Sequence, residues 1–227
     1  MALGPFQVAE KLNQGKRERG VALLMRHGET AWNREGRVMG RQPVDLDEAG
    51  REQVALAVPL AQMLAPDLIV SSPLPRAVQS AEIVARGVGS IDILTDDRLE
   101  EVRYGFWEGM TYHQLIKEES YITYCKAPLE SLTPGGETIA QVQARGVAAV
   151  DAAVTTHRGK RLLFISHGDI IRTVLCHYMR LDLRHFQRLR IDNAAFSGVE
   201  ISDDFAEIKF LNLLADADRA FRSPFPK

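Results

Sequence analysis

Two apolar runs of this chain end in the same polar pattern, a histidine followed by a glycine. The run VALLM leads into Arg26, His27 and Gly28, and the run RLLFIS leads into His167 and Gly168. An imidazole can act as a nucleophile or transfer protons at neutral pH, and glycine allows a sharp turn and the close approach of a ligand. One histidine at a strand end is more often structural, but two such ends predict a site that both histidines share.

An arginine in a third segment indicates the kind of ligand. Arg76 opens the helical segment after SSPLP, where its charge opposes the helix dipole. A bound anion would compensate for this conflict, and a planar guanidinium can bind two phosphate oxygens at once. An exposed arginine at a helix start is the plain alternative, so Arg76 indicates an anion site only together with the two histidines.

Apolar runs alternate with helical segments, which predicts an α/β fold with a mostly parallel central sheet and helices on both faces. We expect strands at 21–25, 67–72, 91–94 and 161–166, and a closing antiparallel pair at 194–202 and 206–213. The carboxyl ends of neighbouring parallel strands meet at one edge of a sheet. If the strands before His27 and His167 are neighbours, both side chains therefore emerge into one crevice.

Helical spacing of apolar residues predicts helices at 47–64, 75–88, 110–119, 138–157 and 169–180. Pro59 is expected to kink or divide the first of them, because proline lacks the amide that an interior helical position uses. The stretch 120–137 is expected to be rich in loops. Arg172, one turn into the last helix, is expected to pair with a nearby carboxylate as part of the scaffold.

Composition restricts the partners and the compartment. The 227 residues include 28 basic and 30 acidic ones, so the net charge of −2 gives no basic excess for nucleic acid. No apolar run approaches the roughly 20 residues that span a bilayer, and the N-terminal stretch has the wrong charge order for a secretion signal. Cys125 and Cys176 have no metal-binding or redox spacing. We expect a cytoplasmic protein without nucleic-acid or membrane partners.

Five motifs, in this order, resemble the histidine phosphatase superfamily with its phosphoglycerate-mutase-like fold: RHGETAWN, SSPLPRAVQSAEI, EEVRYGFWEG, PGGET and FISHGDIIR. The resemblance spans about residues 21–213, and the late stretch IDNAAFSGVEIS resembles the family's closing strand. It implies an N-terminal extension of residues 1–20, a catalytic domain of residues 21–214 and a C-terminal tail of residues 215–227.

By this resemblance, His27 is the nucleophile that becomes a phosphohistidine and Glu101 is the general acid and base. The neighbouring Glu100 is the rival for the second role, although a solvated side chain is the more natural interpretation of it. The resemblance further implies a phosphate pocket of Arg26, Arg76 and His167. It places three other residues near the substrate: Asn33, Arg37 and Gly168.

The chemistry of phosphomonoesters requires such a set. The transition state spreads negative charge over the phosphoryl oxygens, and catalysis is mainly positioning and charge stabilisation. Arg26, Arg76 and a protonated His167 are expected to provide the charge that metal ions provide elsewhere. The arginines should lower the pKa of His27, and a bound dianion should raise the pKa of Glu101. No set of metal ligands stands out, so we expect no metal and no cofactor.

A phosphatase acting on a small phosphorylated metabolite is the favoured function. The family's cofactor-dependent phosphoglycerate mutases carry a long basic insertion after the acid segment, whereas the stretch 105–137 is short and has only His113, Lys117 and Lys126 as basic residues. Such a mutase and a non-catalytic module that binds phosphorylated ligands are the alternatives. The identity of the substrate and the formation of a homodimer stay open.

Overall fold

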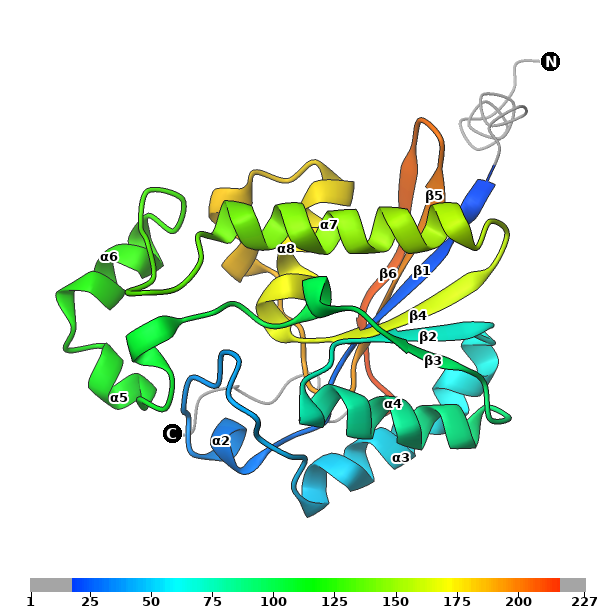
Figure 1. Ribbon diagram of the computed structural model, residues 1–227, viewed down its shortest axis with the longest axis horizontal. Coiled ribbons are helices and arrows are strands. Elements are labelled where there is room, and N and C mark those ends of the chain that lie inside the picture. The colour runs from blue at the N-terminus through cyan, green and yellow to red at the C-terminus, as the bar shows by residue number, and fades with distance from the viewer. Residues whose placement is uncertain (1–17, 217–227) are drawn as a thin grey trace.

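The computed structural model describes residues 18–216, which form a six-stranded sheet in the order β3-β2-β4-β1-β5-β6 (Figure 1). Neighbours among β3, β2, β4 and β1 are parallel, whereas β5 runs antiparallel to β1 and pairs with β6. The strands are β1 (Glu18–Arg26), β2 (Leu68–Ser71), β3 (Ile93–Thr95), β4 (Arg161–Ser166), β5 (Phe196–Ser202) and β6 (Ala206–Leu213). The prediction of a mostly parallel sheet with a closing antiparallel pair is confirmed. Most of the expected N-terminal extension and C-terminal tail lies outside the described residues.

The two strands that carry the histidines are neighbours inside the sheet. β1 and β4 pair in parallel, and the last pair in their register is Arg26 opposite Ser166. Their apolar side chains are buried on both faces of the sheet, as is typical of central parallel strands. Because both strands end at the same level, His27 and His167 leave the same edge of the sheet, as the sequence predicts.

Two pairs of helices cover the two faces of the sheet (Figure 1). One pair is α3 (Glu48–Leu64) with α4 (Pro75–Gly87), and the other is α7 (Ile139–Thr156) with α8 (Gly168–Met179). Successive residues of β1 alternate between the two cores, so that Leu23 packs in the layer of α3 and α4 and Leu24 packs in the layer of α7 and α8. Two helical layers therefore hold the ends of β1 and β4 in place.

Shorter helices complete the described part of the chain. They are α2 (Ala31–Arg34), α5 (Tyr112–Leu115), α6 (Glu119–Lys126) and the 3₁₀ helices η1 (Asp97–Leu99), η2 (Gly105–Trp107) and η3 (Leu183–Arg188). Figure 1 shows α5 and α6 at one end of the molecule, apart from the helices that cover the sheet. None of the helices within residues 18–216 is long and apolar enough to cross a membrane.

Two expectations about helices are wrong. The segment 110–119 holds only the short α5 and the first residue of α6, and α6 occupies part of the stretch that was expected to be loops. Tyr121 and Tyr124, one turn apart on α6, pack their rings edge-on against Trp107 at centroid distances of 5.4 and 5.5 Å. This tertiary packing stabilises a helix whose own sequence is a weak signal.

Pro59 does not divide α3, which is continuous from Glu48 to Leu64. The ring of Pro59 and the preceding turn at Ala55 lie on the exposed face of the helix. The Ala55 carbonyl, which loses its helical amide partner at Pro59, can therefore bind water instead.

The loop after β1 packs directly against the start of α3. A Cβ atom at Gly28 would lie 2.4 Å from the Gly50 carbonyl oxygen, and a Cβ at Gly50 would lie 1.9 Å from the Glu29 carbonyl oxygen. The amide of Gly50 also donates to the side chain of Asp47, which caps the helix, at 2.8 Å. The two glycines thus let α3 fix the backbone just after His27.

The substitution Gly50→Ala should lower the free energy of unfolding by about 1–3 kcal/mol, because the new methyl group collides with backbone that cannot rotate away. Alanine has the higher helix propensity, so a loss of stability would isolate the steric effect. Urea denaturation measures it, with the exposed Glu52→Ala on the same helix as the control. Equal stability of the two variants would contradict this close approach.

Candidate active site

The two histidines at the strand ends meet in the structure. The ring centroids of His27 and His167 lie 5.1 Å apart, and both side chains are buried. Between them lies the guanidinium of Arg76, whose Nε is 3.3 Å from His27 Nε2 and 3.2 Å from His167 Nδ1. The predicted meeting of these three residues is confirmed.

Hydrogen bonds fix which ring nitrogen of each histidine carries the proton. His27 Nδ1 lies 2.6 Å from the carbonyl oxygen of Gly28, which can only accept, so Nδ1 is the donor. Its Nε2 is then the acceptor that faces Arg76. In His167, Nδ1 accepts from Arg76, and Nε2 donates to Ser72 Oγ at 2.8 Å. The lone pair of His27 Nε2 is therefore directed into the site.

Both histidines are neutral in the free protein. Burial lowers the pKa of His27 and of His167 well below the usual range, and the positive charge of Arg76 lowers both further. The predicted lowering of the His27 pKa is confirmed, although burial rather than the arginines is the larger cause. A protonated His167 is expected with phosphate bound and stays a prediction; in the free protein, burial beside the Arg76 guanidinium favours the neutral form.

Arg76 is fully buried at the start of α4, and backbone carbonyls hold it. Its Nη1 donates to the carbonyl of Gln42 at 2.9 Å and its Nη2 donates to the carbonyl of Gly40 at 2.7 Å. Burial lowers the pKa of Arg76 to about 10, and the negative charge of Glu101 opposes this shift, so the guanidinium stays protonated at neutral pH. Its Nε edge is the part that faces the two imidazoles.

Arg26, the last residue of β1, brings a second guanidinium. Its Nη1 donates to the carbonyl of Ile191 at 2.8 Å, but its Nε is buried without a hydrogen-bond partner among residues 18–216. A Cβ at Gly168 would lie 3.7 Å from this Nε, so the glycine keeps side-chain atoms away from that face of the guanidinium. A buried donor without a partner is costly, and a bound anion would satisfy it.

Glu101 supplies the carboxyl group of the site. Its Oε1 accepts from the amide of Val102 at 3.0 Å, and its Oε2 lies 3.4 Å from the amide nitrogen of Asp169. The residue keeps some exposed surface, but burial of the carboxyl raises its pKa, and the charge of Asp169 adds to this effect against Arg76 and Arg26. Glu100, the rival, instead pairs its carboxylate with Arg41 Nη1 at 2.9 Å.

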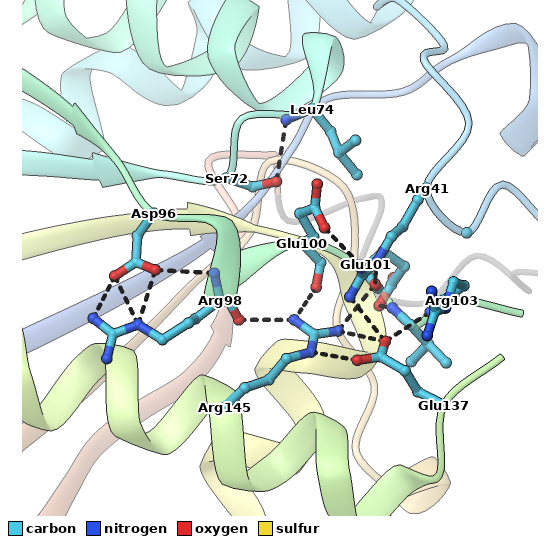
Figure 2. Close-up of polar contacts among 12 residues, drawn as sticks. Arg41, Ser72, Leu74, Asp96, Arg98, Glu100, Glu101, Arg103, Glu137 and Arg145 are labelled. Carbon is cyan, nitrogen blue, oxygen red and sulfur yellow. Dashed lines mark hydrogen bonds and ion pairs between the residues drawn. The ribbon is translucent and has the colours of Figure 1, made fainter.

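Two arginines hold the backbone at Glu101 and just before it (Figure 2). Arg145 donates to the carbonyl oxygens of Arg98 at 2.7 Å and Glu101 at 3.0 Å, and it also donates to the carbonyl of Glu100. Arg41 donates its Nε–H to the Glu101 carbonyl at 3.3 Å. The main chain that presents Glu101 is therefore fixed by side chains that are distant in sequence.

Glu137, from the PGGET motif, holds the two arginines together (Figure 2). It accepts from Arg145 Nε at 3.0 Å and Arg41 Nη2 at 3.1 Å, and from the amide of Arg103 at 3.0 Å. Burial by itself would raise the pKa of Glu137, but these hydrogen bonds and the two positive charges outweigh it and lower the pKa. The sequence shows the PGGET motif as a family feature but does not indicate this contact, and no residue pattern around Arg41 or Arg145 points to it.

Asn33 and Arg37 lie in the segment after β1. Asn33 Oδ1 caps α2 by accepting from the amide of Thr30 at 3.1 Å, and it lies 3.5 Å from Asn193 Nδ2, which itself donates to the carbonyl of His27 at 3.0 Å. The Arg37 guanidinium pairs with Glu35 and donates to the carbonyl of Gly109 at 2.9 Å. Asn33 is thus linked to the backbone of the site, and for Arg37 a contact with substrate stays a prediction.

The arrangement combines a neutral imidazole, two fixed guanidinium groups and a carboxyl group with a raised pKa. These are the parts needed to bind a phosphoryl group, attack it and protonate its leaving group. Within residues 18–216, no three or more histidine, cysteine, aspartate or glutamate side chains are grouped so that they could hold a metal ion.

Known proteins share the sequence and the fold. The chain is 32% identical over 156 residues to phosphoglycerate mutase-like protein 4 of Arabidopsis thaliana, covering 67% of this chain and 68% of that one. It is 30% identical over 196 residues to phosphoserine phosphatase 1 of Hydrogenobacter thermophilus, covering 84% of this chain and 91% of that one. The solved structure of YhfR from Bacillus stearothermophilus superposes with a TM-score of 0.81 at 28% identity, covering 86% of this chain and 98% of that one.

The family model of the histidine phosphatase superfamily, branch 1, matches residues 22–214. This match contains the whole sheet except the first residues of β1, and it contains every residue of the site described above. Together with the shared fold and the extent of the sequence similarity, it shows that the chain belongs to the histidine phosphatase superfamily.

Proposed function

We propose that this protein is a metal-independent phosphomonoesterase that hydrolyses a small phosphorylated metabolite through a phosphohistidine on His27. The observation that carries the proposal is that His27 Nε2 is the unprotonated ring nitrogen and lies 3.3 Å from Arg76 Nε, while the preceding residue, Arg26, has an Nε that is buried without a partner among residues 18–216. A module that only bound phosphate would need the arginines but not an imidazole prepared for attack.

In the first half-reaction, His27 Nε2 attacks phosphorus and the bond from phosphorus to the leaving oxygen breaks. Glu101, whose pKa is raised by burial and would be raised further by a bound dianion, gives its proton to the departing alkoxide. Arg26 and Arg76 stabilise the negative charge of the phosphoryl oxygens, since two fixed cations need no rearrangement as the charge develops. The dianion also raises the pKa of His167, which can then take up a proton at Nδ1 and donate to the phosphate.

In the second half-reaction, water attacks the phosphohistidine. Glu101 is now a carboxylate and takes a proton from this water, while the bond between phosphorus and His27 Nε2 breaks. Inorganic phosphate leaves, the imidazole returns to its neutral form and Glu101 is protonated again. The positive charge of the two arginines is what we expect to replace a metal ion in both steps.

The stretch between η2 and α7 supports hydrolysis of a small molecule. It is short, and three basic side chains, at positions 113, 117 and 126, are all that it offers for a second acidic group of a mutase substrate. The similarity to a protein named phosphoserine phosphatase 1 supports the same class of reaction. We assign this activity to the catalytic domain of residues 21–214, and the match of the family model to residues 22–214 supports that boundary.

A cytoplasmic location and the lack of a nucleic-acid partner remain part of the proposal. The net charge of −2 and the two free cysteines, one exposed and one buried, support them. A homodimer stays a prediction of the sequence.

Hydrolysis of p-nitrophenyl phosphate in EDTA tests the proposal. We expect His27→Ala to lower kcat by about 10³-fold or more, because the covalent route is lost, whereas the exposed His185→Ala should change it little. Quenching without acid should trap phosphohistidine in the wild type only. Activity that requires a metal, or isomerisation of 3-phosphoglycerate faster than hydrolysis, would refute the assignment.

Binding of inorganic phosphate tests the pocket without turnover. Phosphate at a hundred times its Kd should add about 2.7 kcal/mol of stability, or about 5–10 °C in Tm for a domain of this size. Arg26→Lys should lose most of this shift, because lysine cannot reproduce the planar fork. The exposed Arg86→Lys on α4 is the matched control. An equal shift in both variants would show that phosphate binds elsewhere.

A further inference from the structure

The carboxylate of Asp169 lies beside the site and is held in place by other side chains, and the mechanism above gives it no role. It is the second residue of α8 and follows His167 and Gly168 directly. Its Oδ2 accepts from the hydroxyl of Tyr104, and its Oδ1 pairs with Nη1 of Arg172. The predicted scaffold pairing of Arg172 is thereby confirmed, and the carboxylate is held from two elements of the fold.

The same residue faces Glu101 in two ways. Its backbone amide nitrogen lies 3.4 Å from Glu101 Oε2, while the amide of Val102 donates to Oε1 at 3.0 Å, so both oxygens of the acid have a partner. Its carboxylate also places a negative charge near the Glu101 carboxyl. After burial, this charge is the largest cause of the raised pKa of Glu101.

The other titratable groups around Glu101 either lower its pKa, are uncharged, or are paired with Asp169. Arg26 from β1 and Arg76 from α4 lower its pKa. Three tyrosines face it from the loop before η2, from α5 and from α6, and burial raises the pKa of each, so they are uncharged at neutral pH: Tyr104, Tyr112 and Tyr124. The charge of Arg172 is directed to Asp169. Besides burial, Asp169 is therefore the group among these described residues that raises the pKa of Glu101, against the lowering by the two arginines and by the amide of Val102.

We propose that Asp169, held by Tyr104 and Arg172, is a positioning residue for the Glu101 carboxyl: its backbone amide fixes one carboxyl oxygen, and its carboxylate holds a negative charge beside the acid. The inference rests on the proposed function, because it assigns Asp169 a role only if Glu101 is the general acid. It further means that Asp169, at the start of α8, opposes the effect of Arg26 and Arg76 on the pKa of Glu101.

The substrate's leaving group provides the sharpest test. A β-glycerol phosphate ester leaves as an alkoxide and needs the proton of Glu101, whereas p-nitrophenolate is a stable anion and needs none. For Asp169→Asn we expect the basic limb of the kcat/KM profile for β-glycerol phosphate to move about one pH unit lower, which lowers the rate about tenfold on that limb. The rate with p-nitrophenyl phosphate should change by less than about threefold.

Matched variants separate charge from structure. Asp169→Ala should shift the limb in the same direction and Asp169→Glu should restore it. Asp151→Asn is the control, because Asp151 also accepts a tyrosine hydroxyl, that of Tyr178, at 3.2 Å on α7. The rise in Tm with inorganic phosphate should persist in all of these variants and would show that they fold with an intact pocket. Equal losses with both esters, or an unmoved limb, would overturn the inference.

A titration followed by NMR gives a readout that does not depend on turnover. With ¹³C-labelled glutamate, the Glu101 carboxyl is assigned by the signal that is lost in Glu101→Gln, and its midpoint should be lower in Asp169→Asn than in the wild type. An unchanged midpoint would defeat the role of Asp169 alone. Failure of the wild type to hydrolyse either ester would instead defeat the proposed function, and the role of Asp169 with it.

Discussion

The buried guanidinium of Arg76 is the charge around which the rest of the site is arranged. A cation without exposed surface costs several kcal/mol to desolvate unless polar groups surround it. The carbonyls of Gly40 and Gln42 provide this, and they leave the Nε edge between the imidazoles of His27 and His167. Because these partners are backbone carbonyls rather than carboxylates, the positive charge is fixed in place but not neutralised.

This arrangement explains why both histidines are neutral in the free protein and why an anion is the natural ligand. Two guanidinium groups and two buried imidazoles lie together here, so that added positive charge is unfavourable and a negatively charged ligand is favourable. Arg26, with its unpartnered Nε, adds a donor that has no other use in the described structure. Burying these donors costs free energy during folding, and hydrogen bonds to a bound oxyanion would offset that cost.

Glu101, the proposed acid, lies on a separate segment and has separate support. The clamp of Arg41, Arg145 and Glu137 holds its backbone, and the start of α8 holds its side chain (Figure 2). Residue 41 also lies between the two residues whose carbonyls hold Arg76, so the same short loop supports both Arg76 and Glu101. A shift of this loop would disturb both halves of the mechanism together.

The sequence by itself determined the sheet and the meeting of the two histidines. Fully apolar runs such as those of β1 and β4 are typical of buried parallel strands, whose neighbours end at one edge of a sheet, so the sequence predicted that His27 and His167 emerge together. The pairing of β1 with β4 confirms this prediction. The arginine at the start of α4 was visible as a local conflict with the helix dipole. The ordered motifs added the candidate acid at position 101.

The sequence predicted the lowered pKa of His27, but only the tertiary structure decided the neutral form of His167 and the supporting contacts. The neutral form of His167 depends on burial beside Arg76, which lies 91 residues earlier in the chain. Helix α6 exists because its tyrosines pack on Trp107, and the clamp on Glu101 uses Arg41 and Arg145, whose neighbours in sequence give no sign of it. Desolvation and long-range contacts arise from the packing of distant segments, and local residue patterns carry no information about them.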